Sequence, residues 1–370
     1  MDDLLAAARR LATMVRETRD YGEQHRHLEP GVLAAMHDAR LFRTLIPKQF
    51  GGLQTDPMTA MEVVETISTA DGAVGWNLMI GSAYGVWAAR LPADVARTIY
   101  SAPDAVAAGA LRPSGKARAV DGGLICNGRW SFASGISHSA WWAGGCTLED
   151  GKVRLVFFPA SDGELIDTWT TGGMRGTGSH DYAIKELFIP ADRIVAMDAP
   201  ARLEDPLYRF PLMALMDSLM ATVPLGIARA AIDAFVAIAG AKVSHNSTTA
   251  SANKPVVQAE VARAEAVVQA ARAWLYESVA QAWADVQAGR TIPTKQLALM
   301  RLARANALTA GVQATDLIHT AAGSASVYSS GLIDRCFRDV HVAGAHTALH
   351  PLNYEVCGAV LLGLPPPRVL

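Results

Sequence analysis

The sequence contains little cysteine, few aromatic residues and little charge. Four of its 370 residues are cysteine, aromatic residues make up 7%, charged residues make up 18%, and the formal net charge is −2. Because no long block of like charge occurs, the sequence argues against nucleic acid and against an anionic membrane as partners. The cysteines stand far apart, without the C-x-x-C spacing of zinc and redox sites: Cys126, Cys146, Cys336 and Cys357. We therefore expect reduced thiols in a cytoplasmic protein.

The chain also has little that resembles an export signal or a membrane span. It carries acidic residues at positions 2 and 3, whereas a secretory signal begins with basic residues, so we expect no export. The longest apolar run, residues 219–241, is interrupted by Pro224, Arg229 and Asp233, which indicates a buried bundle helix. Hydrophobic residues nevertheless make up 51% of the chain. Since the few polar side chains cover an isolated monomer poorly, we expect a homotetramer or homodimer.

Three zones follow one another along the chain. Residues 1–105 repeat apolar residues at the helical spacings of three and four. Residues 106–198 consist of short β-branched and aromatic runs bounded by glycine, aspartate and proline, which is typical of a β domain. Residues 199–370 return to long helical patterns, with the polar stretch 244–254 between two of them. The expected fold class is α+β, with an N-terminal α-helical domain, a central β domain and a C-terminal four-helix bundle.

Three segments carry most of the residues that could bear chemistry. They are "GRWSFASGISHSAWW" (128–142), "WTTGGMRGTGSHDYAIKELFIPADRIV" (169–195) and "GSASVYSSGLIDRCFRDVHVAGAH" (323–346). Occurring in this order within a helical, β, helical chain, they resemble the acyl-CoA dehydrogenase superfamily. The resemblance covers nearly the whole chain and implies a flavin cofactor.

By this resemblance, residues 128–142 form the strand that faces the flavin. An aromatic side chain can cover one face of the flat flavin ring, while a nearby hydroxyl holds its edge. The resemblance therefore implies cofactor contacts from Trp130, Ser131, Ser134 and Gly135, with Ser134 as the preferred contact. The alternative is an ordinary strand with Trp130 packed inward and the serines outward.

The glycine-rich segment "GGMRGTGSHD" is the second part of the implied flavin site. Glycines let backbone N–H groups approach a ligand, and hydroxyls add donors. The segment matches neither a Walker loop nor a dinucleotide-binding turn. The resemblance implies cofactor contacts from Trp169, Arg175, Thr177 and Ser179, and the alternative is a tight turn between strands.

Three histidines lie within ten residues near the end of the chain: His341, His346 and His350. A zinc site would place the last two on one helical face with Cys357. Proline is favoured at the first helical position, so we expect a helix to begin at Pro351 and His346 to lie in the preceding loop. We therefore expect no metal site.

The first of two departures from the dehydrogenase pattern concerns the catalytic base. Aligning Arg338 and Asp339 with the family's Arg-Asp pair places His346 and Thr347 where the family carries a tyrosine and the glutamate base. The family's alternative base position lies one step from Asp217, which would point about 100° away around the helix. The expected base is therefore missing.

The second departure concerns the cofactor. In the family, an Arg-x-x-Phe-Gly stretch holds the pyrophosphate of FAD, whereas residues 241–258 contain no arginine and no Phe-Gly. We expect FMN as the cofactor, with FAD possible. Both departures resemble the flavin-dependent monooxygenase branch, the oxygenase components of two-component systems. Such proteins take reduced flavin from a separate reductase, form a C4a-hydroperoxide with O2 and oxygenate a small aromatic or heteroatom-containing substrate.

His346 and Ser134 are the catalytic residues in this interpretation. Imidazole exchanges protons near neutral pH, and a hydroxyl can stabilise the oxygenated flavin edge. A dry apolar pocket would protect the reaction, and its expected walls are three aromatic residues and one histidine: Tyr84, Trp87, His138 and Trp141. Two other functions stay open, an acyl-CoA dehydrogenase with a displaced base such as Asp217 and an inactive flavin-binding or assembly scaffold.

Overall fold

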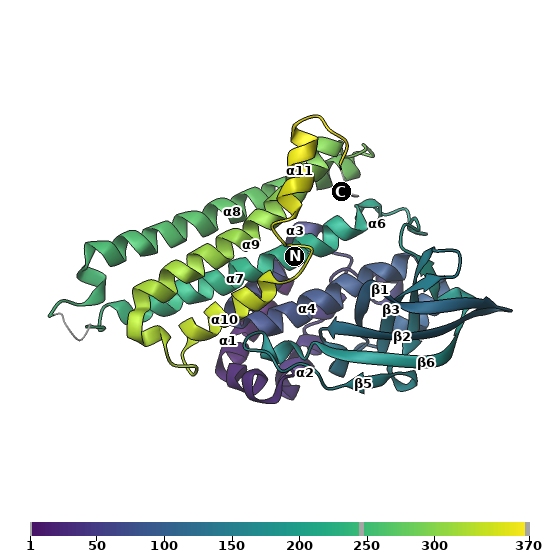
Figure 1. The fold of residues 1–370 in the computed structure, drawn as a ribbon, viewed down its shortest axis with the longest axis horizontal. Helices are drawn as coiled ribbons and strands as arrows, with labels where there is room; N and C mark the ends of the chain where they lie inside the picture. The colour runs from purple at the N-terminus through teal and green to yellow at the C-terminus, as the bar shows by residue number, and fades with distance from the viewer. Residues whose placement is uncertain (1, 244–247, 367–370) are drawn as a thin grey trace.

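The computed structural model describes residues 2–243 and 248–366, so part of the polar stretch 244–254, its residues 244–247, lies outside the described residues. The N-terminal part is helical, and Glu29, Asp56 and Asp71 cap three of its helices by accepting a backbone N–H in the first turn. Its helices are α1 (Asp2–His25), α2 (Pro30–Asp38), α3 (Pro57–Ala70), α4 (Gly72–Gly85) and α5 (Ala93–Tyr100). They lie between the sheet and the bundle (Figure 1).

The central part is one mixed sheet of seven strands in the order β5-β6-β2-β1-β3-β4-β7. Strands β1 and β3 pair in parallel, and the other pairs are antiparallel. The pairing of β2 with β6 shifts register between Trp130 and Ala133, which is a β-bulge. The strands are β1 (Ala107–Val120), β2 (Gly123–Ala133), β3 (Trp141–Leu148), β4 (Val153–Pro159), β5 (Glu164–Ile166), β6 (His180–Pro190) and β7 (Ile194–Ala196).

The C-terminal part contains four helices that run side by side, α7 to α10 (Figure 1). Its helices are α6 (Pro206–Arg209), α7 (Leu212–Ala239), α8 (Pro255–Gln287), α9 (Thr294–Ala322), α10 (Leu332–Gly344) and α11 (Asn353–Leu361). Helix α7 is long and apolar enough to span a membrane, but 67% of its most apolar window is buried, and it packs against α3, α9 and α10. It is therefore the core helix of the bundle.

The expected α+β architecture is confirmed. The predicted boundaries at 105/106 and 198/199 fall in the connections between α5 and β1 and between β7 and α6. The last helix begins at Asn353, two residues after the predicted start at Pro351. His346 lies in the loop between α10 and α11.

Candidate flavin and catalytic site

Three buried hydroxyl groups meet between the end of β2 and the glycine-rich loop that precedes β6. The Oγ atoms of Ser134 and Ser179 lie 2.7 Å apart, and Ser179 Oγ lies 2.6 Å from Thr177 Oγ1. Each of the three side chains is at most 5% exposed. The structure thus brings Ser134, Thr177 and Ser179 together from two segments that are more than forty residues apart.

The two ends of this hydroxyl cluster fix the direction of its hydrogen bonds. At one end the indole N–H of Trp76 donates to Ser134 Oγ over 2.9 Å. At the other end Thr177 Oγ1 donates to the carbonyl oxygen of Met174 over 2.8 Å. Because an indole N–H only donates and a carbonyl only accepts, Ser134 donates to Ser179 and Ser179 donates to Thr177. Ser134 Oγ therefore keeps one acceptor lone pair for a further partner.

A β-bulge near the end of β2 turns Ser134 toward the loop. Phe132 has φ +64°, which is unusual for a non-glycine residue, and its side chain is 72% exposed. Gly135 follows with φ +73°, and its N–H donates to Thr177 O over 3.0 Å. A Cβ on Gly135 would lie 3.1 Å from the amide oxygen of Asn77. Glycine is needed here because the backbone is left-handed and the space is small.

His346 contacts the same Trp76 ring whose N–H bonds Ser134. Its ring meets the Trp76 ring edge to face at a centroid distance of 5.7 Å. Its Nδ1 accepts the N–H of Ala348 over 3.2 Å, so the proton of the neutral ring lies on Nε2. Burial lowers the pKa of His346 to about 4, and the ring is neutral at pH 7. The two expected catalytic residues, His346 and Ser134, thus contact the same indole.

Two of the expected cofactor contacts, Trp130 and Arg175, make their hydrogen bonds to backbone carbonyl oxygens of the protein. Trp130 is fully buried in the β domain, where it stacks on Tyr182 at 5.0 Å and its indole N–H donates to Gly145 O over 2.8 Å. No surface of Trp130 is open to a ligand, so the expected flavin contact of Trp130 is wrong. Trp130 packs inward as in the alternative of an ordinary strand, but Ser134, which that alternative placed outward, is buried. The Arg175 guanidinium donates to the carbonyl oxygens of Glu23 and Thr171, which ties the loop to α1. Ser131 is exposed, and Trp169 donates its indole N–H to Met174 O over 2.9 Å.

Three of the expected pocket walls are aromatic residues: Tyr84, Trp87 and Trp141. Trp87 is 0% exposed and Tyr84 is 2% exposed in the core. Tyr84 follows Trp76 by eight residues, which corresponds to about 12 Å along the helix axis. Trp141 lies under the Arg193 guanidinium at 5.1 Å. Tyr84 and Trp87 are buried because α4 and η3 (Val86–Ala89) are buried almost all round, and the Tyr84 hydroxyl and the Trp87 indole N–H have no hydrogen-bond partner among the described residues. Trp141 is half-buried at the start of β3.

His138 differs from these walls because it is a polar group next to the site. Its Nε2 is buried without a hydrogen-bond partner, and its ring lies 5.9 Å from that of Phe42. Burial lowers the pKa of His138 to about 4. Its ring lies beside Gly135, the residue that follows Ser134.

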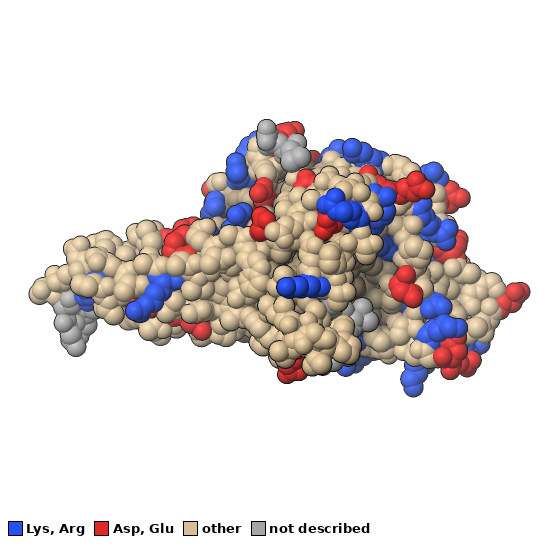
Figure 2. Space-filling view, turned by 90° about the horizontal axis from the view of Figure 1, so that it is seen from above, with Lys and Arg blue, Asp and Glu red and all other residues tan. Residues whose placement is uncertain are grey.

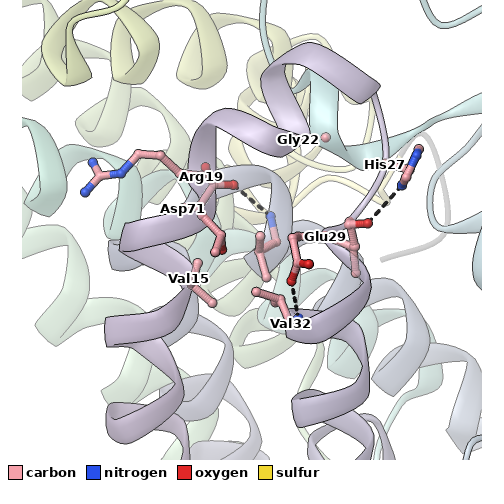
Figure 3. Close-up of a pocket in the computed structure, with 11 residues that line it drawn as sticks. Val15, Arg19, Gly22, His27, Glu29, Val32 and Asp71 are labelled. Atoms are coloured by element: carbon pink, nitrogen blue, oxygen red, sulfur yellow. Dashed lines mark hydrogen bonds between the residues drawn. The ribbon is translucent and has the colours of Figure 1, made fainter.

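The two neighbours of His346 in the sequence, His341 and His350, have other partners. His341 bonds Phe337 O through Nδ1 and faces Asp316 on the bundle surface, and His350 Nδ1 accepts the N–H of Leu352. Over residues 2–243 and 248–366, no group of three potential metal ligands is found. Figure 3 shows a cavity of about 10 Å³ between α1, α2 and the start of α4. It has room for about one water molecule and none for a substrate.

Asp217, the displaced base considered for a dehydrogenase, points into the bundle. Its Oδ2 lies 3.9 Å from Nη1 of Arg304, a residue that is 3% exposed. Burial raises the pKa of Asp217, and the two arginines Arg304 and Arg301 oppose that shift. The charged neighbours of Asp217 are thus arginines of helix α9 in the bundle.

Sequence reasoning missed two residues of the site, Trp76 and Phe132. Trp76 joins Ser134 to His346, and Phe132 lies exposed with its ring edge to face against Trp169 at 6.2 Å. An indole in an otherwise uncharged helix is a weak signal, because most such residues are core. Phe132 had no signal in the sequence, because the bulge that turns Ser131 and Phe132 outward in succession is visible only in the structure.

Comparison with known proteins identifies the family. Residues 3–91 match the acyl-CoA dehydrogenase N-terminal domain, and residues 218–351 match the acyl-CoA dehydrogenase C-terminal domain. The chain is 33% identical over 359 residues to indole-3-acetate monooxygenase of Pseudomonas putida, covering 95% of this chain and 92% of that protein. The chain belongs to the acyl-CoA dehydrogenase family.

Further relatives define the branch. The flavin-dependent monooxygenase oxygenase subunit HsaA of Mycobacterium tuberculosis is 28% identical, with 98% of this chain and 96% of that protein covered. The crystal structure of 3-HSA hydroxylase from Rhodococcus sp. RHA1 has a TM-score of 0.93 and 25% identity, over 98% of this chain and 97% of that one. XiaF from Streptomyces sp., solved with FADH2 and glycerol, shares the fold with a TM-score of 0.94 at 24% identity over 100% and 97% of the chains. The protein is a flavin-dependent monooxygenase, the oxygenase component of a two-component system, and it uses reduced flavin.

Proposed function

We propose that this oxygenase inserts one oxygen atom of O2 into a small aromatic substrate at the site between Ser134 and His346. The observation that carries the proposal is the pair of contacts on Trp76: its N–H bonds Ser134 and its ring meets His346. The flavin would lie on the Ser134 side and the substrate on the His346 side. Reduced flavin supplies the electrons that activate O2.

The residues at this site fit a flavin ring. Phe132 and Trp169 offer apolar ring surface beside the hydroxyl cluster, and Phe132 is 72% exposed. We assign to Phe132 the role of covering the flavin that was expected of Trp130, with Trp169 next to it. The spare lone pair of Ser134 Oγ can accept the N–H that reduced flavins carry on the central ring and oxidised flavins lack. This feature favours the reduced cofactor.

The substrate class is proposed from the surroundings of His346 and from the relatives. The Trp76 ring that faces His346 is 6% exposed and offers an aromatic surface. The relatives are named as acting on indole-3-acetate and on resorcinol, both aromatic compounds. A neutral His346 with its proton on Nε2 can hold a polar substituent on such a ring. We propose an indole or a phenol as the substrate class, and FMN rather than FAD as the cofactor.

The test is a conversion assay with chemically reduced FMN, ¹⁸O2 and a panel of indoles and phenols. One ¹⁸O atom in the product, with Ser134→Ala reducing its yield, supports the proposal. Bleaching of bound oxidised flavin by an acyl-CoA panel would instead support a dehydrogenase. A chain that binds neither reduced nor oxidised flavin would support the scaffold alternative. Binding of FAD with an affinity tenfold above that of FMN would overturn the FMN assignment.

We further propose that the protein works as a cytoplasmic homotetramer or homodimer supplied by a separate flavin reductase. Large apolar side chains are exposed on α8 and around α11, including Val256, Leu361 and Leu362. Figure 2 shows that the narrow end of the bundle is mostly uncharged. Such surface is commonly covered by another copy of the chain. A single-chain mass by light scattering at micromolar concentration would contradict this.

A further inference from the structure

The backbone of Met174 is a junction on which the hydroxyl cluster depends. Its carbonyl oxygen accepts from Trp169 Nε1 over 2.9 Å and from Thr177 Oγ1 over 2.8 Å. Its φ is +51°, a left-handed conformation that costs a non-glycine residue about 1 kcal/mol or more. Something must hold this peptide in place, because both side chains that would border the flavin bond to it.

Asp339 on α10 holds the other side of the same residue. Its Oδ1 accepts the N–H of Met174, and its side chain is 4% exposed. Two neighbouring contacts press the loop onto α10: Arg338 donates to Gly172 O, and a Cβ on Gly173 would lie 2.3 Å from Arg338 O. The loop therefore docks on this helix through its backbone.

The surroundings of Asp339 are strongly charged. Burial and the nearby carboxylates of Asp71 and Glu23 together raise its pKa to about 7, although the Met174 N–H and Arg338 oppose the shift. Arg335 on the same helix lies close to Asp71 and donates to Asp20 of α1. A carboxyl group kept here against such unfavourable electrostatics indicates a specific role, because buried charges without one are rare.

We propose that Asp339 is a positioning residue for the flavin site, which fixes the left-handed Met174 peptide and thereby Thr177, Trp169 and the hydroxyl chain that ends at Ser134. Helix α10 ends at Gly344 and leads directly to His346. The same helix therefore sets the loop on the flavin side and the start of the histidine loop. This inference rests on the proposed assignment of the flavin to the hydroxyl cluster.

The first experiment measures amide hydrogen exchange of residues 172–178 in the protein without flavin. Asp339→Ala should speed exchange of this segment about 10- to 100-fold, the range expected when a buried N–H loses its hydrogen-bond partner. Asp339→Asn keeps an acceptor and should change it less than threefold. Asp334→Ala is the matched control, since Asp334 is on the same helix and pairs with Arg338 but not with Met174. Unchanged exchange in Asp339→Ala would overturn the proposal.

The second experiment asks whether Asp339 acts through the strained peptide. Met174→Gly removes the cost of the left-handed φ, so Asp339→Ala should weaken reduced-FMN binding at least tenfold in the parent but less than threefold in the Met174→Gly background. Equal losses in both backgrounds would show that Asp339 merely supports α10. If Asp339→Ala does not fold, Asp339→Leu, which has a similar shape and no acceptor, replaces it. A parent protein that binds no reduced FMN would refute the proposed flavin site, while the exchange result would still decide the role of Asp339.

Discussion

Replacing His346 by two different side chains tests whether it works as a hydrogen-bond donor or as a titrating group. Its pKa of about 4 means that about one molecule in a thousand carries imidazolium at pH 7. Its Nδ1 accepts the N–H of Ala348, so the neutral ring carries its proton on Nε2 and can donate from there. A donor that never changes its protonation state accounts for this geometry better than a base at Nε2 does.

The expected outcome follows from that tautomer. His346→Ala should cut product formation about a hundredfold, within the range for losing a catalytic donor or acid–base group, and raise release of hydrogen peroxide. His346→Gln keeps an N–H donor near the Nε2 position and should stay within about tenfold of the parent. Reduced-FMN binding should be nearly intact in both. Product yield and peroxide are measured together at pH 7, with His341→Ala as the control that changes little.

Two results would refute this reasoning. If His346→Gln is as inactive as His346→Ala, the ring must titrate during turnover and the donor assignment is wrong. If His341→Ala is the worse of the two alanine variants, the assignment of the catalytic histidine is wrong. Stability provides a second check, because a folded pKa below the ordinary 6.5 stabilises the native state above pH 6.5 and this is lost as the pH falls toward 4. The loss amounts to at most about 3 kcal/mol and should be absent in His346→Gln.

Three further predictions follow from the packing. Trp130→Phe loses the bond to Gly145 O, so it should lower the free energy of unfolding by about 1–3 kcal/mol in denaturant titrations and leave FMN affinity unchanged. Asp217→Asn should keep product formation within about twofold of the parent. If Asp217 were the catalytic base of a dehydrogenase, the same substitution would remove nearly all activity. Because the folded pKa of Asp339 lies above its ordinary value, the free energy of unfolding of the parent should fall relative to that of Asp339→Asn as the pH rises from about 4 to 7. Above pH 7 the two curves of unfolding free energy against pH should run parallel. Curves that are parallel from pH 4 upward would contradict the raised pKa.

The architecture was predictable because each zone has its own hydrophobic period. Helical spacing before residue 105 and after 199 and alternating runs between them correspond to the observed elements. The one boundary error, Pro351, arose because proline fits the first helical turn but does not require a helix. The chain makes a turn at Pro351 and Leu352 before α11 begins.

The site was predictable only where the residue type and the resemblance agreed. Ser134 and His346 are polar residues at positions that the resemblance singles out, and the structure places both on Trp76. Trp130 was assigned wrongly because simple alternation along β2 cannot show the bulge, which puts Ser131 and Phe132 outward in succession. The hydrogen bonds that organise the site, such as those of Ser134 with Trp76 and Ser179, join residues that are far apart in the sequence, so no local pattern predicts them.

Asp339 illustrates why such contacts escape sequence reasoning. Its partner is a backbone N–H 165 residues earlier, and a backbone group has no signature in the sequence. The hydroxyl chain itself contains no group that titrates near neutral pH, since it runs from an indole N–H through three hydroxyls to a carbonyl. Its direction, and with it the acceptor character of Ser134, is therefore the same at every pH at which the protein is folded. Besides the flavin itself, two titratable groups behind the hydroxyl chain can make flavin binding depend on pH: Asp339 behind Met174, and His180, whose Nδ1 accepts the Trp169 N–H and faces Asp167. The Asp339→Asn variant removes the contribution of Asp339 and leaves the other two.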